Sequence, residues 1–341
     1  MPGIPWSAED EKRLIRDYPA GVPIDTLSAS FGRTEGAIHN KAQEMGLKWA
    51  SSPGKGFTVQ KPPSASRDLE TLFRDQTESY RRKAERGEAK KQGISVTIHE
   101  EAPYGILFFG DPHGDDDGCD LEYLSHCFSV VRETEGLYGV NIGDLTNNWL
   151  KVLGHLYAHQ HTTDDEAVKL CEWIIGAIDW LWIVLGNHDK WSILAERICE
   201  EKQVMHVSHG GIFVIRCGDH ELKIDARHDH AGRSMYNPAH GQIKRNYRGS
   251  DARIIVGGHI HQGARTTIRN GVTGQLSECI RLGAFKRYDE YADMKGFDED
   301  SVGPACLVTV DPKTDDVQCW FNVDSGARYL QMLRSDALAA A

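Results

Sequence analysis

The sequence Ile106-Leu107-Phe108-Phe109-Gly110-Asp111-Pro112-His113 joins an apolar run to a short polar cluster. Similar clusters recur four times further along the chain, three of them after apolar runs and one after an alternating stretch. They are Gly143-Asp144, Gly186-Asn187-His188-Asp189, Arg227-His228-Asp229-His230 and Gly258-His259-Ile260-His261. Short apolar runs are typical of buried strands, and the carboxyl ends of parallel strands lie at one edge of a sheet. We therefore expect the clusters to converge at one edge of an α/β fold.

The side chains in these clusters are ligands for divalent transition metals. Carboxylate, amide oxygen and neutral imidazole suit Mn, Fe, Zn or Ni better than Ca, and no cysteine occurs in any cluster. Two cations a few Å apart repel each other, so an anionic ligand must lie between them. Asp144, at a strand end, is the candidate for that position.

The order of the clusters (DxH, GD, GNH[DE], H, GHxH) resembles that of calcineurin-like metallophosphoesterases, over about residues 102–325. The resemblance implies an α/β fold with a two-sheet β-sandwich flanked by helices, and a metal-dependent phosphoesterase activity. It implies two divalent ions, with Mn²⁺ expected and Fe, Zn or Ni as alternatives. One ion would be held by Asp111, His113, Asp144 and His261, and the other by Asp144, Asn187, His228 and His259.

The fourth cluster leaves its ligand open between three histidines. His228 directly ends the expected strand, whereas His230 would share its face if the strand continued. His240 is followed by Gly241, which matches the usual His-Gly of the family, but it comes after an Asn-Pro turn signal. We favour His228.

The same resemblance implies a mechanism. A water or hydroxide shared by two cations, with Asp144 between them, is the nucleophile in an in-line displacement. His188 would donate a hydrogen bond or a proton to the phosphoryl or leaving oxygen. Asp189 would either orient that imidazole or cap the following helix.

One difference from a branch of the family bears on the substrate. Phosphoprotein phosphatases resemble GDxxDRG after the second strand, and the position of their phosphate-clamping arginine is Asn148 here. This difference favours diesterases and nucleases. Arg227, Arg233, Lys286 and Arg287 could contact phosphate instead, although each is by default a solvated surface charge.

The first fifty residues predict a small all-α domain of three helices. Ser7 caps the first helix, a second follows Pro23, and Gly32-Arg33-Thr34 leads into the third. With Trp6, this pattern resembles Myb-like or SANT-like helix-turn-helix modules over residues 4–48. The resemblance places Arg33, His39, Asn40 and Gln43 toward DNA.

Charge leaves a second role open for this module. Residues 1–50 contain six basic and seven acidic side chains, a net charge of −1, whereas affinity for DNA comes largely from phosphate neutralisation. Docking to another protein is therefore the alternative.

The expected organisation has five segments. They are a helix-turn-helix domain at 1–50, a linker at 51–66, a charged helix at 67–93, the catalytic domain at 94–330 and a C-terminal tail at 331–341. Within the catalytic domain we expect strands ending at 110, 143, 186 and 257 and helices at 120–134, 164–180 and 191–203. A hairpin at 211–227 and strands at 305–311 and 317–323 would form a second, mixed sheet, and 283–297 a loop beside the site.

Composition indicates the surroundings of the chain. The 341 residues carry a net charge of −11, and the eight cysteines contain no Cys-x-x-Cys pair, as expected for buried thiols of a reducing compartment. The N-terminus lacks an export signal and no apolar run has membrane-spanning length, so we expect a cytoplasmic protein with no membrane contact. The oligomeric state stays open.

The leading hypothesis is a two-metal phosphodiesterase, a nuclease brought to DNA by its N-terminal module. One alternative is a phosphatase or diesterase of small nucleotides whose module serves only localisation. Another is a DNA-binding regulator with an inactive phosphoesterase domain, against which the complete ligand set argues.

Overall fold

The protein is described by a computed structural model over most of its length. The described residues are 5–49, 67–148, 160–234, 236–288 and 303–339. The chain divides into two compact units, Met1–Thr77 and Glu78–Ala341. The expected linker at 51–66 lies outside the described residues, as does most of the loop expected at 283–297.

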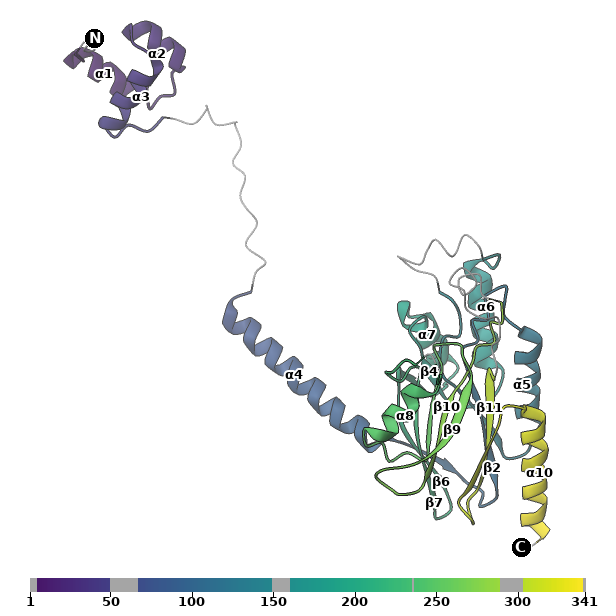
Figure 1. The fold of residues 1–341 in the computed structure, drawn as a ribbon. Helices are drawn as coiled ribbons and strands as arrows, with labels where there is room; N and C mark the ends of the chain where they lie inside the picture. Colours follow the sequence, from purple (N-terminus) through teal and green to yellow (C-terminus); the bar gives the residue numbers. More distant parts are fainter. Residues whose placement is uncertain (1–4, 50–66, 149–159, 235, 289–302, 340–341) are drawn as a thin grey trace. The chain divides into compact units, whose positions relative to one another are not determined.

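The first unit contains the three predicted helices (Figure 1), α1 (Ala8–Asp17), α2 (Ile24–Phe31) and α3 (Glu35–Glu44). The Ser7 hydroxyl caps α1 by accepting from Asp10 N at 3.1 Å, and the Thr34 hydroxyl caps α3. A small core closes the unit and consists of Leu14, Tyr18, Leu27, Ile38 and Ala42. The predicted three-helix domain is confirmed.

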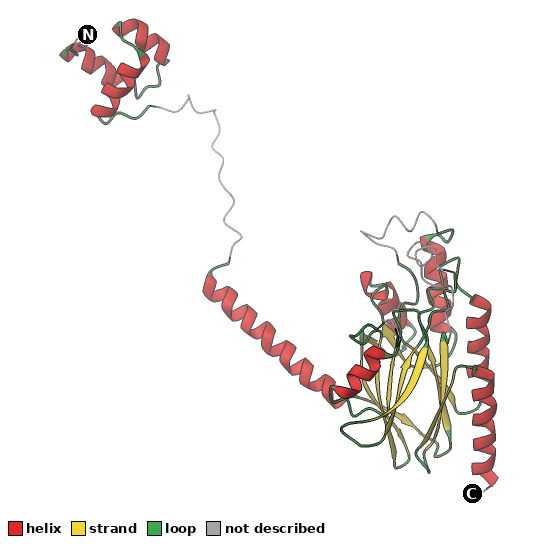
Figure 2. Cartoon of the chain, in the orientation of Figure 1, coloured by secondary structure: helices red, strands yellow, loops and turns green. Residues whose placement is uncertain are grey.

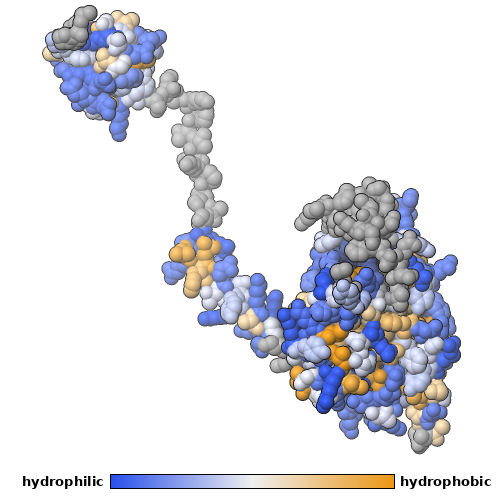
Figure 3. Space-filling model, in the orientation of Figure 1, coloured by the Kyte–Doolittle hydropathy of each residue, from blue (hydrophilic) through white to orange (hydrophobic). Residues whose placement is uncertain are grey.

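A long helix, α4 (Leu69–Gln92), crosses the boundary between the two units. It corresponds to the charged helix expected at 67–93. Two of its few apolar residues are strongly exposed, Leu69 at 81% and Phe73 at 73%. Figure 3 shows hydrophobic surface at the N-terminal end of this helix.

The second unit is built on two six-stranded sheets (Figure 2). The strand order of the first is β12-β11-β2-β3-β4-β5 and that of the second is β1-β6-β7-β8-β10-β9. The first consists of β2 (Tyr104–Phe109), β3 (Leu137–Asn141), β4 (Trp180–Leu185), β5 (His206–Ser208), β11 (Ala305–Asp311) and β12 (Asp316–Trp320). The second consists of β1 (Ile94–Ile98), β6 (Gly210–Cys217), β7 (His220–Arg227), β8 (Ile254–Gly257), β9 (Ala264–Arg269) and β10 (Leu276–Arg281).

The strand β2 is apolar throughout because both of its faces are buried. Ile106 and Phe108 belong to the core between the two sheets, whereas Leu107 and Phe109 pack under the helices. A strand buried on both faces needs apolar residues at every position. The predicted two-sheet sandwich flanked by helices is confirmed.

One part of the predicted sheet arrangement is wrong. The hairpin β6–β7 and the late strands β11 and β12 do not share a sheet, because β11 pairs antiparallel with β2 while β7 pairs parallel with β8. The short strand β5 and the strands β1, β9 and β10 were not predicted. The exposed positions of β9 alternate with half-buried ones, so this edge strand has no continuous apolar run.

Helices cover the outer faces of both sheets. Over the sheet that contains β2 lie α5 (Leu121–Glu133), α6 (Asp164–Gly176), α7 (Leu194–Glu201) and α10 (Val323–Ala339). Over the other sheet lies α8 (His240–Tyr247). The tail expected at 331–341 is corrected, because residues 331–339 continue α10 and Arg334 within them is buried.

Among the described residues, no helix combines the length and the apolar character that crossing a membrane requires. All eight cysteines are free thiols, and seven of them are buried.

Candidate metal centre

The polar clusters follow strands of both sheets. Asp111, Asp144 and Asn187 come directly or nearly directly after the parallel neighbours β2, β3 and β4. His228 and His259 follow β7 and β8, which are parallel neighbours in the other sheet. The two sheets therefore bring their clusters to a common edge.

One group of ligand atoms consists of Asp111, His113 and His261, whose donor atoms lie within 4.8 Å of one another. The Nε2 atoms of His113 and His261 are 3.2 Å apart, and His261 Nε2 is 3.4 Å from Asp111 Oδ2. Asp111 is fully buried and His113 is 2% exposed. Such a set can hold one divalent cation.

A second group consists of Asp144, His228 and His259, again with donor atoms within 4.8 Å. His228 Nε2 lies 3.0 Å from Asp144 Oδ2 and 3.1 Å from His259 Nδ1. It is also 2.9 Å from Asn187 Oδ1. The four side chains that the resemblance implies for the second ion are thus adjacent.

Asp144 lies between the two groups. Its Oδ2 atom, which is 3.0 Å from His228 Nε2, is 4.0 Å from His113 Nε2 of the first group. The Asp144 side chain is 1% exposed, so its carboxylate points into the site and away from solvent. This is the position that a ligand shared by two cations must have.

The three histidines of the fourth cluster differ in their surroundings. His228 Nδ1 donates to Ile142 O at 3.0 Å, which leaves Nε2 facing Asn187 and Asp144. His230 is buried and its Nε2 donates to Val256 O. His240 begins α8. The structure thus brings His228 to the other candidate ligands.

Several candidate ligands have a backbone conformation that side chains rarely adopt. The φ angles are +44° at His113, +55° at Asp144, +72° at His259 and +59° at His261. Each left-handed residue other than glycine costs about 1–3 kcal/mol and persists only where its surroundings hold it. Such residues concentrate at functional sites, and these four lie together.

The charge states of the imidazoles differ. Burial lowers the pKa of His113 well below its usual value, so this ring is neutral. Burial also acts to lower the pKa of His228, but the carboxylates of Asp144 and Asp111 outweigh it and raise the pKa to about 10. The pKa of Asp144 is held low by the same pairing, against the effect of burial.

A buried oxygen without a hydrogen bond tests whether cations fit these residues. Asp111 Oδ1 is buried and accepts no hydrogen bond from the described residues. A buried carboxylate oxygen without a donor is costly, and a bound cation offsets that cost. With oxygen and imidazole donors and no thiolate, the set fits divalent Mn, Fe, Zn or Ni.

His188 is held from several sides beside these groups. Its Nδ1 hydrogen-bonds to the carbonyl of Asn147, and its ring lies 4.2 Å from that of Trp191, centroid to centroid. Its backbone N donates to Asp144 Oδ1 at 2.9 Å, and its carbonyl accepts from Asn148 Nδ2 at 2.7 Å. The imidazole therefore has a defined orientation.

The contacts of Asp189 differ from both expected roles, which were to orient the His188 imidazole or to cap the following helix. Its carboxylate accepts from the backbone N of Asp144 at 2.7 Å, of Gly186 at 2.8 Å and of Leu145 at 3.0 Å. It begins a short 3-10 helix, η3 (Asp189–Trp191), without a side-chain cap bond there. Asp189 thus ties the loop after β3 to the loop after β4, which orients Asp144.

Sequence reasoning did not identify a network that supports His188. Asp115 Oδ1 accepts from Asn147 N at 2.6 Å, and Asp116 Oδ2 accepts from Asn147 Nδ2 at 2.6 Å. The buried Lys286 donates to Asp116 at 2.8 Å. These contacts fix Asn147, whose carbonyl binds His188. The run of three aspartates at 115–117, one residue after the first cluster, was the available signal.

The cations considered for phosphate contacts are paired with acidic neighbours. Arg227 pairs with Asp225, Arg233 with Asp229, Lys286 with Asp116 and Arg287 with Asp120. Asn148, at the position of the clamping arginine, donates to the carbonyl of His188 and to Ser192 Oγ.

A third group of donor atoms is formed by Glu196, Glu200 and His206, on the partly exposed surface of α7 and β5. Glu196 is already 2.7 Å from Lys190 Nζ. The Lys190 ammonium already neutralises the charge of the Glu196 carboxylate, so we assign no metal ion to this group.

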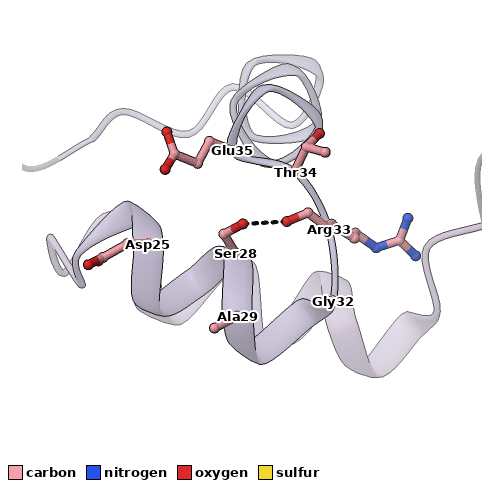
Figure 4. A pocket seen from close by; sticks show the side chains of 7 residues that line it. All are labelled: Asp25, Ser28, Ala29, Gly32, Arg33, Thr34 and Glu35. Atoms are coloured by element: carbon pink, nitrogen blue, oxygen red, sulfur yellow. Dashed lines mark hydrogen bonds between the residues drawn. The ribbon is translucent and has the colours of Figure 1, made fainter.

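In the N-terminal unit, two of the four residues expected at DNA are used internally. Arg33 lies 4.2 Å over the Trp6 ring and donates to Pro5 O. His39 Nδ1 is 2.7 Å from the Tyr18 hydroxyl, whereas Asn40 and Gln43 are exposed on α3. Figure 4 shows a shallow hollow between α2 and the start of α3, where Ser28 bonds to the backbone of Arg33 while the Arg33 side chain points away.

Comparisons with known proteins find only a weak structural similarity between this chain and solved structures. No family profile matches the sequence, and no curated protein matches it. A conserved protein of Streptococcus pneumoniae, described as a predicted phosphoesterase, is 14% identical with a TM-score of 0.31, over 64% of this chain and 98% of that one.

Two further solved structures are similar at the same level. The calcineurin-like phosphoesterase YfkN of Bacillus subtilis is 10% identical with a TM-score of 0.38, over 67% of this chain and 99% of that one. Vps29 of Entamoeba histolytica, complexed with Zn²⁺, is 14% identical with a TM-score of 0.35, over 64% and 99%. All three TM-scores are below 0.5, so the function proposed below rests on the residues of this chain alone.

Proposed function

We propose that this chain is a two-metal phosphodiesterase that acts on DNA. The observation that carries the proposal is the convergence of two ligand groups, Asp111/His113/His261 and Asp144/His228/His259, with Asp144 between them. Buried carboxylates and imidazoles at this density need cations to offset their charge and to use their lone pairs.

When bound, two divalent ions would supply an acidified water and neutralise phosphoryl oxygens. Asp111, His113 and His261 would hold one ion, and Asn187, His228 and His259 would hold the other, with Asp144 available to both. Asp189 orients Asp144 through its backbone bonds. Mn²⁺ is the ion we would test first.

His188 assists the departure of the leaving group. Because Nδ1 is held by the Asn147 carbonyl, the imidazolium form presents its second N–H at Nε2. That proton can be donated to the leaving oxygen of a diester, which is otherwise expelled as a poorly stable alkoxide. The Trp191 ring beside His188 keeps the imidazole in this orientation.

The residues favour a diester over a phosphoprotein monoester. A monoester carries more charge and is commonly held by an arginine, yet Asn148 occupies that position and binds the backbone of His188. DNA is the proposed diester because the sequence of the three-helix unit before the site resembles a helix-turn-helix, with Asn40 and Gln43 exposed on its third helix.

A specific observation favours a second candidate, the hydrolysis of small nucleotide diesters. The exposed positions of α3 are Glu35, Gly36, His39, Asn40, Gln43 and Glu44, and none is a lysine or an arginine. Lys41 is occupied by Glu11 at 2.9 Å and by Glu44 at 3.3 Å. Weak phosphate neutralisation by α3 would leave the module a role in localisation only.

The test compares substrates on one preparation of the full chain loaded with Mn²⁺. Bis(p-nitrophenyl) phosphate should be hydrolysed faster than p-nitrophenyl phosphate, and plasmid or single-stranded DNA faster than cyclic nucleotides, RNA or a phosphopeptide. Preference for cyclic or small nucleotides would replace the first candidate by the second. No hydrolysis of any ester by metal-loaded protein would refute both and favour an inactive, DNA-binding regulator.

A further inference from the structure

Arg281 is an unusual residue beside the metal centre. It is the last residue of β10, in register with Gly257 at the end of β8, and its side chain is fully buried. Its Nη1 donates to Gly258 O at 2.8 Å and lies 3.5 Å from Asp229 Oδ1. Its Nε and Nη2 have no hydrogen-bond partner among the described residues.

This arrangement is expensive if Arg281 only fills space. Burying a guanidinium costs several kcal/mol unless its donors are paired, and here two of its three nitrogens are not. A methionine of similar length would fill the same volume without that cost. What the arginine adds is a charged donor aimed at one carbonyl, that of Gly258.

The Gly258 peptide connects the clusters that form the site. Gly258 N donates to His228 O at 2.9 Å, and its carbonyl also accepts from Ile260 N at 3.0 Å. The next residue, His259, donates its N–H to Asp111 Oδ2 at 2.6 Å. A Cβ at Gly258 would stand 2.3 Å from Asp111 Oδ1, so this position must remain glycine.

The loop after Gly258 is the part that needs support. His259 and His261 both have left-handed backbone conformations, with φ of +72° and +59°. Residues of this kind return to ordinary conformations unless contacts hold them. The bond from Arg281 fixes the carbonyl at which this conformation begins.

We infer that Arg281 is a positioning residue that holds the Gly258 peptide so that His259 and His261 face their ions. The inference rests on the proposed function, because it concerns the same metal centre. Arg281 is not one of the candidate metal ligands and would act through the Gly258 carbonyl on His259. Asp229, which also pairs with the exposed Arg233, orients the guanidinium.

The experiment measures metal binding by the full chain. Wild type, Arg281→Met and Arg281→Lys are stripped with chelator and titrated with Mn²⁺ and Co²⁺ by calorimetry, with the visible spectrum of Co²⁺ as a report of ligand geometry. Arg334→Met is the matched control, because Arg334 is also buried but bonds to Pro103 O, Glu100 and Glu135, outside the site.

We expect two ions for wild type. Arg281→Met should bind the ion of the His259 group about 10–100-fold more weakly, as typical for loss of a contact that orients a ligand. Arg281→Lys should lie between the two, since it retains a charged donor, and its Co²⁺ spectrum should stay closer to wild type. Arg334→Met should match wild type in affinity even where its thermal stability falls.

Other results would overturn the inference. Equal affinities for wild type and Arg281→Met would remove the positioning role, because methionine fills the same volume. Equal weakening by Met and Lys would show that a charged donor at this position is not what holds the Gly258 carbonyl. The same weakening in Arg334→Met would show a general loss of stability. If Arg281→Met does not fold, the lysine variant decides, and wild-type affinity in that variant counts against Arg281. A wild-type chain that binds no ion would instead refute the proposed function.

Discussion

The candidate metal centre and the N-terminal module hold their polar side chains in different ways. In the centre, Asp111 and Asp144 are buried, and the loops that carry them are fixed by backbone bonds and left-handed residues. On α3, Asn40 and Gln43 are exposed on a regular helix. Because burying a polar side chain costs free energy, buried polar side chains indicate a functional site. Exposed polar side chains are explained by solvation alone.

The largest expected effect tests the centre. Asp144→Asn should retain the fold but lose bound metal and about 10³-fold or more of kcat/KM on an aryl phosphodiester, because several kcal/mol of charge stabilisation disappear. Turnover together with metal content by mass spectrometry measures both. Asp311→Asn, at the end of β11, is the control. An Asp144→Asn variant with normal metal content would contradict the shared position of this carboxylate.

His188→Asn should separate chemistry from metal binding. We expect kcat to fall by about 10²-fold, since general acid assistance contributes about that much, while both ions remain bound. The loss should be smaller on a substrate whose leaving group is a good one, such as p-nitrophenolate, than on DNA. An equal loss on both substrates would argue against a role at the leaving oxygen.

Substitutions in the N-terminal module should change binding to DNA but not hydrolysis. The double change Asn40→Ala and Gln43→Ala should weaken binding to DNA by about 30-fold, since each lost base contact costs about 1 kcal/mol or more, and should leave hydrolysis of an aryl diester unaltered. Fluorescence anisotropy with labelled duplex measures the effect, and Ser30→Ala on α2 is the control. Unchanged anisotropy would assign the module to a protein partner or to localisation.

The smallest effect concerns the ion pair between the buried Arg334 and the partly exposed Glu100. The Arg334 guanidinium holds the pKa of Glu100 below its usual value. A lowered pKa adds stability above the pKa of the unfolded chain, near 4.5, and this is lost as pH falls through the lower folded value. Glu100→Gln should therefore lower Tm by about 1 °C at pH 7 and not at all near pH 2, because such pairs contribute little. A difference that persists in acid would exclude the ion pair as its cause.

Much of the fold could be predicted because apolar runs and periodicity report burial. The strands β2, β3, β4 and β8 each end beside a polar cluster, and the hairpin expected at 211–227 is formed by β6 and β7. The assignment of strands to the two sheets could not be predicted, because the pairing of β11 with β2 depends on contacts between residues about 200 positions apart. The edge strand β9 gave no run because half its positions face solvent.

For the candidate site, too, only part of the structure could be predicted from the sequence. The residue types and order predicted which side chains gather, and the structure does bring Asp111, Asp144, Asn187, His228 and His259 together. Several supporting bonds escaped prediction because one partner is the backbone, as where Asp189 accepts from three N–H groups or Arg281 donates to Gly258 O. Backbone partners leave no trace in residue types.

The state of the cysteines has a practical consequence. All eight are free, seven are buried, and burial raises the pKa even of the partly accessible Cys119 to about 12. Thiolates react with maleimides and thiols hardly do, so the folded native chain should label slowly. One cysteine placed on the exposed face of α2 and one on α5 could then carry a dye pair, and energy transfer between them would measure the distance between these two helices with and without nucleic acid.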